Sequence, residues 1–265
     1  MTIFNGERLE TELFQLDRER MADGWYSDVY FRNIAGILEK LSKEGYEFKG
    51  QDIGNLEVEM QIFPRRQPYS IIGGIDEALS ILKTSTGYKD EDGNFINTFD
   101  QLEVEACHDG EKAFYKGNPH NVDPVLKIRG RYRDFSILET PILGSLTEAS
   151  RIATNVYQVM IAARGKDILF FPARFAHYKM QALHGYAYSL GVNAYNNEYD
   201  TNTQRFISTD EQGAWWGGKG GGTISHSYVA SFLGDTTEAM LQFGHLMRLD
   251  VDRMALLGFE KACVN

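Results

Sequence analysis

The pattern of strands and helices changes at Phe135, and this change limits the folds open to the chain. Beyond it, Ile168–Phe171 is a short and wholly apolar segment, typical of a strand buried in a parallel sheet. A second short strand is expected at Arg205–Ser208, so that strands and helices alternate. This alternation predicts βα units and a parallel sheet or barrel. A closed barrel needs about eight such units, and residues 168–265 hold too few strands for it, so we predict an incomplete α/β barrel.

Helices are expected before and between these strands. Leu138–Leu143 starts a helical stretch, and apolar residues at helical spacing predict a second helix over Glu148–Ala163. Arg174–Leu190 is read as a helix in which His177 and His184 lie seven residues apart and share one face. Core or surface positions are the commoner role of such histidines, and a functional site is the alternative. The last expected elements are the helix Thr236–Leu249 and the strand Arg253–Leu257.

The first 135 residues have a different pattern, typical of a largely antiparallel sheet with a few helices. Asn55–Phe63 alternates apolar and polar residues, which predicts a half-buried strand. The dipeptide Asp109-Gly110 suits a turn with positive φ, so Leu102–Cys107 and Lys112–Tyr115 are predicted to be the two arms of one hairpin. We therefore expect two domains: a mixed α+β domain at residues 1–135 and the first half of an α/β barrel at residues 136–265.

Two tyrosines flank a predicted helix start in the first domain. Ser27-Asp28 can cap a helix that runs to about Leu41, and Tyr26 and Tyr30 lie on either side of this cap. Packing in the core or in a hydrophobic staple at the helix start is the commoner role for such tyrosines. The alternative is a ring that stacks on an aromatic ligand.

The composition argues against several classes of function. A net charge of −10 is unfavourable for a broad nucleic-acid interface, although local arginines can still hold a small anion. No apolar run reaches the roughly 18 residues of a membrane-spanning helix, and the N-terminus lacks the features of a signal peptide. The two distant cysteines, Cys107 and Cys263, suit free thiols in a reducing compartment. We expect a cytoplasmic protein that binds neither nucleic acid nor membrane.

A glycine-rich stretch, Gly217–Val229, is the first candidate for a functional site. Thr223 or Ser225 is a plausible cap for the helix that follows it. Free N–H groups at a helix start attract anions, and His226 would lie in the first turn, close to such an anion. The alternative is a flexible loop with an ordinary cap, because a glycine-rich motif alone is weak evidence.

Five segments match the motifs of one enzyme family in order. The stretch G-T-I-S-H-S-Y-V at Gly222–Val229 is similar to G-T-x-x-H-S-x-V, and S-D-V-Y at Ser27–Tyr30 is similar to T-D-L-Y. L-E-T at Leu138–Thr140 matches a Leu-Glu-Thr helix start, and R-I-A-T at Arg151–Thr154 is similar to S-x-A-T. F-P-A-R-F-A-H at Phe171–His177 resembles F-G-x-R-R. Together these segments, which span nearly the whole chain, resemble nicotinate phosphoribosyltransferase, an enzyme of NAD salvage.

The resemblance implies an α/β barrel of the type II phosphoribosyltransferase kind behind an α+β domain. It also implies a ligase and glycosyltransferase that joins nicotinate to phosphoribosyl pyrophosphate, giving nicotinate mononucleotide and pyrophosphate, coupled to ATP hydrolysis. His226 stands at the family's histidine that ATP phosphorylates transiently, and Thr223 matches a threonine that contacts nicotinate. Tyr30 matches a tyrosine that packs on the pyridine ring. Arg174 matches the first arginine of F-G-x-R-R and is a candidate for anion contact.

Cofactors and partners follow from the same resemblance. Mg²⁺ is expected to arrive with the substrate phosphates, because it is usually held by phosphates and one or two carboxylates. Asp235 and Glu238 are the candidate carboxylates, and the sequence shows no dedicated metal site. Family members work as dimers in which the N-terminal domain helps to complete the partner's site, so a homodimer is implied.

Departures from the family pattern keep other interpretations open. Phe175 stands in place of the second arginine, Pro172 in place of the preceding glycine, and Gly258 in place of a strand-ending aspartate. The family's second half-barrel has no counterpart in residues 1–265, so we predict a fragment or split subunit, with a possible second chain completing the barrel. The alternatives are a nicotinamide or quinolinate phosphoribosyltransferase, and a catalytically inactive binding protein of the same fold.

Overall fold

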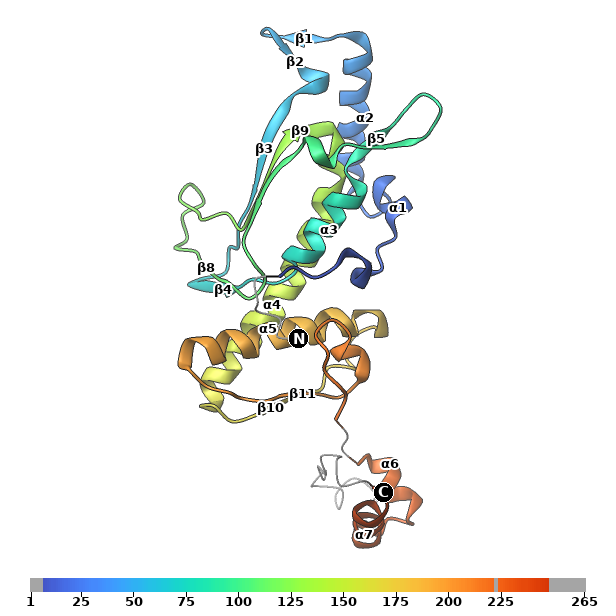
Figure 1. The fold of residues 1–265 in the computed structure, drawn as a ribbon, viewed down its shortest axis with the longest axis vertical. Coiled ribbons are helices and arrows are strands. Elements are labelled where there is room, and N and C mark those ends of the chain that lie inside the picture. The colour runs from blue at the N-terminus through green and yellow to red at the C-terminus, as the bar shows by residue number, and fades with distance from the viewer. Residues whose placement is uncertain (1–6, 222–223, 248–265) are drawn as a thin grey trace.

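A three-stranded antiparallel sheet forms the centre of the N-terminal part in the computed structural model, which describes residues 7–221 and 224–247 (Figure 1). The strands β3 (Glu57–Ile62) and β7 (Glu103–Ala106) flank β9 (Leu126–Arg131) and pair with it antiparallel. In β3 the apolar side chains alternate with exposed polar ones. The predicted half-buried strand is therefore confirmed.

Helices cover this sheet and close the first core. The helix α3 (Ile75–Ser85) contributes Ile75, Ile81 and Leu82, which are fully buried with residues of β9 and the start of α4. The helix α2 (Val29–Glu44) starts after Asp28 as predicted, but the Asp28 side chain makes no capping hydrogen bond. The helix ends at Gly45, whose φ of 63° suits glycine. The remaining short elements are α1 (Arg18–Ala22), β1 (Glu47–Phe48), β2 (Gln51–Asp52), β4 (Tyr69–Ile71), β5 (Gly87–Lys89), β6 (Phe95–Asn97) and β8 (Lys112–Phe114).

The predicted hairpin around Asp109-Gly110 is wrong, although both of its arms are strands. β7 pairs with β9, whereas β8 pairs with β4. The turn between them is held by α3, because Asp109 Oδ1 accepts a hydrogen bond of 2.8 Å from the backbone N–H of Ile75. Gly110 also donates to the carbonyl of Ile72 at 2.7 Å. Because the turn is anchored in this way, the strands on its two sides join different sheets.

One continuous helix, α4 (Glu139–Ala163), replaces the two helices expected between Leu138 and Ala163. Pro141 does not interrupt this helix, because it lies in the first turn, where a backbone N–H has no hydrogen-bond partner within the helix. The helix runs from the N-terminal part down to α5 (Gln181–Tyr199) and packs against it (Figure 1). Gly191 permits this crossing, since a Cβ there would lie 2.5 Å from the carbonyl oxygen of Ala153.

The predicted parallel arrangement is confirmed beyond α4. The strand β10 (Ile168–Phe170) pairs in parallel with β11 (Arg205–Ile207), and α5 connects them. An isolated parallel bridge joins Ile207 to Gly220 on the other side of β11. Within the described residues these elements do not close into a barrel. The strand β10 is half-buried instead of fully buried, so the expectation from its apolar sequence overstated its burial.

The last described helices form a small unit of their own. The helix α6 (His226–Ser231) packs on α7 (Thr236–Leu246) through a cluster that includes Ile224, Val229 and Ala239. The strand expected at Arg253–Leu257 lies outside the described residues. No helix in the described part of the chain is long and apolar enough to cross a membrane. The domain boundary at residue 135 stays a prediction.

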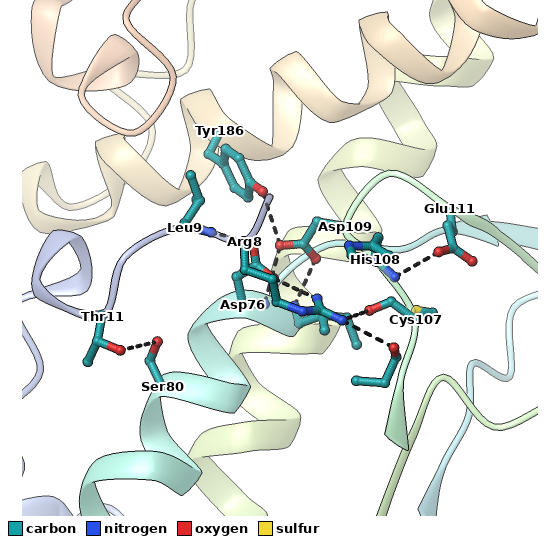
Figure 2. A network of polar contacts seen from close by, with 12 residues as sticks. Arg8, Leu9, Thr11, Asp76, Ser80, Cys107, His108, Asp109, Glu111 and Tyr186 are labelled. Carbon is teal, nitrogen blue, oxygen red and sulfur yellow. Dashed lines mark hydrogen bonds and ion pairs between the residues drawn. The ribbon is translucent and has the colours of Figure 1, made fainter. Parts of the chain in front are cut away.

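A buried polar network ties the N-terminal segment to α3 and α5 (Figure 2). Asp76 accepts from Arg8 at 2.7 Å and from the backbone N–H of Leu9 at 2.9 Å. Asp109, in the β7–β8 turn, accepts from the Tyr186 hydroxyl at 3.1 Å. Burial, followed by the neighbouring charge of Asp76, raises the pKa of Asp109 to about 7. The ionised form of this carboxyl is therefore costly in the folded protein.

Candidate functional site

The carboxyl ends of β10 and β11 meet at one edge of the parallel pair, where Phe170 is in register with Ile207. Open α/β sheets commonly bind ligands at this edge, because the loops that leave it lie side by side. The loop after β10 carries Arg174, and the turn after β11 carries Asp210. The parallel bridge at Gly220 brings the chain that leads to His226 back to the same strand.

Arg174 lies in a turn and not in the predicted helix. Phe175 donates to the carbonyl of Pro172 at 2.8 Å, and regular helix begins only at Gln181. The side chain of Arg174 is exposed, and no carboxylate within the described ranges pairs with it. Its guanidinium therefore presents an uncompensated positive charge near the end of β10, which suits contact with an anion.

Close packing requires Gly218 of the candidate stretch and Gly213, which precedes the stretch. A Cβ at Gly218 would lie 2.3 Å from the Trp216 ring, and one at Gly213 would lie 2.0 Å from the carbonyl oxygen of Gly218. The indole N–H of Trp216 donates to the carbonyl of Gln212 at 2.7 Å, which fixes the ring over this turn. Close packing therefore explains why glycine occupies these two positions, which neither the flexible-loop nor the anion-loop interpretation predicted.

A capping box orders the turn after β11 and was missed in the sequence. Thr209 caps the 3₁₀ helix η7 (Asp210–Gly213), and the Gln212 side chain accepts from the backbone N–H of Thr209 at 3.1 Å. Asp210 Oδ1 accepts from the N–H of Gly220 at 2.9 Å, which holds the glycine stretch against this turn. The spacing of Thr209 and Gln212 is the sequence signal that could have located it.

His226 is the first residue of α6 and is exposed. The predicted cap at Ser225 is confirmed, because its side chain accepts from the N–H of Tyr228 at 3.2 Å. Thr223, the predicted pyridine contact, lies outside the described residues. The assignments of His226 and Thr223 therefore stay predictions.

Two of the matched motifs meet at the start of α2. The backbone N–H of Asp28 donates to the Thr140 hydroxyl at 3.0 Å, which joins the S-D-V-Y segment to the L-E-T segment. Burial, followed by the charge of Asp28, raises the pKa of Glu139 beside this contact. Tyr30 is 57% exposed, and its hydroxyl donates to Asp28 at 3.3 Å. Core packing of Tyr30 is therefore excluded, and its ring remains accessible.

Tyr30 and His226 are not brought together within one chain. Figure 1 places α2 in the upper part of the molecule and α6 at its lower end. The predicted site residues thus fall into two groups along the chain, with Tyr30 at the start of α2 and Arg174 and His226 in the segments that follow β10 and β11.

The two histidines of the predicted pair have separate roles, and the expected contact of Asp235 and Glu238 with Mg²⁺ stays a prediction. His177 precedes α5 and caps a 3₁₀ turn, whereas His184 is buried in α5 with Nε2 at 2.6 Å from Glu148. They do not share a helix face. Asp235 caps α7 by accepting from the N–H of Glu238 at 2.9 Å. Among the described residues, no group of three or more His, Cys, Asp or Glu side chains is arranged to hold a metal.

Comparison with known proteins identifies the fold of the chain. Residues 28–150 match the family model of the quinolinate phosphoribosyl transferase N-terminal domain. The whole chain is similar to a nicotinate-nucleotide pyrophosphorylase from Pyrococcus furiosus, with 24% sequence identity and a TM-score of 0.65, over 91% of this chain and 52% of that one. The chain has the type II phosphoribosyltransferase fold. The predicted α/β fold class is confirmed.

A second solved structure supports the same fold. Human nicotinic acid phosphoribosyltransferase matches with 19% identity and a TM-score of 0.54, over 77% of this chain and 40% of that one. The chain thus spans about half the length of the structures that it matches. The segment matched by the family model runs from Asp28 past Thr140, so it includes the contact between them.

Proposed function

We propose that the chain belongs to a phosphoribosyltransferase of NAD synthesis that transfers the phosphoribosyl group to nicotinate. The observation that carries this proposal is the uncompensated charge of Arg174 at the carboxyl edge of β10 and β11, in the fold described above. The stretch that carries His226 returns to the same strand through Gly220. Such an edge suits a substrate that carries anionic groups, such as the phosphate and diphosphate of phosphoribosyl pyrophosphate.

In the proposed reaction the pyridine nitrogen attacks C1 of the ribose while the bond from C1 to the pyrophosphate oxygen breaks. The bond electrons leave with pyrophosphate, and positive charge develops on the ribose ring. Arg174 would hold either the nicotinate carboxylate or the departing pyrophosphate by charge-assisted hydrogen bonds. Its position in an ordered turn favours this role, since positioning and charge stabilisation supply most of the catalysis in transfers of this kind.

His226 would couple the reaction to ATP. A neutral imidazole nitrogen can attack the γ-phosphorus of ATP, forming phosphohistidine and releasing ADP. Its place at the start of α6, with an exposed side chain, gives ATP access to it. Mg²⁺ would enter with the phosphates of ATP and phosphoribosyl pyrophosphate, because Asp210 and Asp235 already accept hydrogen bonds from the backbone N–H groups of Gly220 and Glu238.

The pyridine contact from Tyr30 would come from a second copy of the chain. The start of α2 exposes Trp25, Tyr26, Val29 and Tyr30, which form an apolar surface unusual for a solvated helix end. The helix α2, which carries Tyr30, lies far from α6, which begins with His226, within one chain (Figure 1). A homodimer in which this surface meets the partner's site would bring the two residues together.

The test of ATP coupling is the variant His226→Ala. We expect nicotinate mononucleotide synthesis to lose its stimulation by ATP, because the phosphate-accepting nitrogen is gone. His177→Ala, at another exposed histidine, should leave the stimulation unchanged. Full ATP stimulation in His226→Ala would contradict the coupling, and an absence of nicotinate mononucleotide synthesis by the unaltered chain would contradict the transferase itself.

Quinolinate is a second candidate substrate, favoured by the family model that matches residues 28–150. Conversion of this dicarboxylate to nicotinate mononucleotide must also release the second carboxylate as CO₂. A competition assay with nicotinate, quinolinate and nicotinamide would decide between them. Release of CO₂ with no response to ATP would favour quinolinate, and binding of phosphoribosyl pyrophosphate without turnover would favour an inactive protein of this fold.

A further inference from the structure

A cavity of about 760 Å³ lies beside the N-terminal sheet, between β3, the loop that follows it and the first turns of α4. Its apolar wall is formed by Ile62, Phe63, Ile72, Val125, Leu143 and Leu146. Cavities of this size, with an apolar wall and a few polar groups, typically bind small molecules. None of Tyr30, Arg174 and His226 lines it, although Glu139 and Arg151, from two of the matched motifs, do.

Three arginines line the same cavity: Arg65, Arg66 and Arg151. In the part of the chain that the structure describes, no carboxylate forms an ion pair with any of them. This distinguishes them from the arginines of the adjacent strand, where Arg129 pairs with Glu103 at 2.5 Å and Arg131 with Asp134 at 2.7 Å. In a chain of net charge −10, three uncompensated guanidinium groups around one cavity indicate a site for an anion.

Arg66 is held in place without being neutralised. Its two terminal nitrogens donate to Asn155 Oδ1 at 2.8 Å and to Gln158 Oε1 at 3.0 Å, both on α4. Asn155 lies one helical turn beyond Arg151, so these contacts draw Arg66 towards Arg151. Arg65 lies with its guanidinium carbon 5.6 Å from the centre of the Phe63 ring. A positively charged end of the cavity is thus built next to an aromatic wall.

The opposite end of the cavity carries the opposite charge. Glu139 also lines it and precedes Arg151 by twelve residues of α4, which is about 18 Å along the helix. An anion is therefore directed to the Arg151 end. Leu143 and Leu146, on the turns between, give the rest of the cavity an apolar surface.

We propose that this cavity binds a mononucleotide, with its phosphate on Arg65, Arg66 and Arg151 and its base against Phe63 and Leu143. Guanidinium groups bind phosphate oxygens in a fork and so suit a dianionic phosphate. A flat base matches the apolar wall. The acidic end at Glu139 and the net negative charge of the chain disfavour a longer nucleic acid.

Binding is tested by calorimetry on the whole chain with adenosine monophosphate and nicotinate mononucleotide as probes. Adenosine and inorganic phosphate serve as the partial probes. At least one mononucleotide should bind at least tenfold more tightly than either partial probe, because the phosphate and the base contact different parts of the cavity. The double variant Arg65→Gln/Arg151→Gln should weaken this binding at least tenfold, and Leu143→Asn should weaken it while leaving phosphate binding unchanged.

Two control variants make the result specific. Arg164→Gln removes an exposed arginine at the end of the same helix and should change the affinity less than twofold. Arg174→Gln is diagnostic in a different way, because it should weaken any binding of nicotinate mononucleotide as product at the proposed catalytic site but leave the binding of adenosine monophosphate in the cavity unchanged. The proposal is overturned if neither mononucleotide binds, if Arg164→Gln weakens binding as much as the double variant, or if only Arg174→Gln abolishes it. Circular dichroism of each variant should match the unaltered chain.

Discussion

At the scale of single residues, Asp109 is the group whose ionisation most directly opposes folding. Its pKa rises from about 3.8 towards 7 because it is buried and lies beside Asp76. The folded protein therefore binds this proton more tightly than the unfolded chain does. The stabilising contribution of Asp109 should be complete below about pH 4, fall as the pH rises from 4 to 7, and be lost above about 7.

The variant Asp109→Asn tests this dependence. Asparagine can still accept from the N–H of Ile75, and it carries no charge to desolvate. We expect the decrease in unfolding free energy between pH 5 and 8, measured by urea denaturation, to become smaller in this variant. Asp123→Asn, at an exposed aspartate, should keep the dependence of the unaltered chain. Identical pH profiles for Asp109→Asn and the unaltered chain would show that Asp109 is not its source.

At the scale of elements, α5 must approach the turn after β11 closely, and Gly185 makes this possible. A Cβ at Gly185 would lie 1.9 Å from the carbonyl oxygen of Gln212, which is backbone and cannot move aside alone. Gly185→Ala should therefore destabilise the protein by about 2 kcal/mol or more, since overpacking typically costs about 1–3 kcal/mol. The measurement is the midpoint of thermal or urea denaturation.

Gly36 in α2 supplies the matched control. It also lies in a helix, but a Cβ there would meet nothing within 4 Å. Gly36→Ala should stabilise the protein by about 0.5–1 kcal/mol, because alanine is the better helix former. Equal effects of the two substitutions would contradict the close approach of α5 and η7.

Local sequence patterns correctly predicted the elements whose structure depends mainly on their own residues. The alternation in β3 and the strand–helix–strand order around α5 were sufficient to predict a half-buried strand and a parallel pair. The partners of β7 and β8 could not be predicted from local sequence, because they depend on how the turn between these strands is anchored. Asp109 in this turn accepts from the N–H of Ile75, and Gly110 donates to the carbonyl of Ile72, both far away in sequence. Arg174 was placed in a helix because its neighbours have helical spacing, whereas Pro172 and the turn at Phe175 delay that helix to Gln181.

The candidate site was predictable to a smaller degree. The motifs located Arg174, His226 and Tyr30 in the sequence, but not their arrangement in space. Their separation into two groups arises from the length of α4, which carries the chain from the contact at Thr140 to α5 (Figure 1). The arginines beside β3 were missed because their common feature, the lack of a carboxylate partner, exists only in three dimensions.

At the scale of the whole molecule, the two groups of site residues predict complementation between copies. If Tyr30 of one copy serves the His226 site of another, Tyr30→Ala and His226→Ala should each lose most ATP-stimulated activity alone. A mixed dimer of the two variants has one site in which both residues are altered and one in which both are intact. Random pairing after co-expression makes about half of the dimers mixed, so about a quarter of the unaltered activity should return.

The alternative arrangement gives a different result. If Tyr30 serves the His226 site of its own chain, every site in a mixed dimer carries one altered residue, and co-expression restores nothing. Dilution provides a further check, because the restored activity should fall at concentrations where the dimers dissociate, as sedimentation can establish independently. Restoration that persists in protein shown to be monomeric would rule out a shared site, because an intact pair of residues would then have to lie within one altered chain.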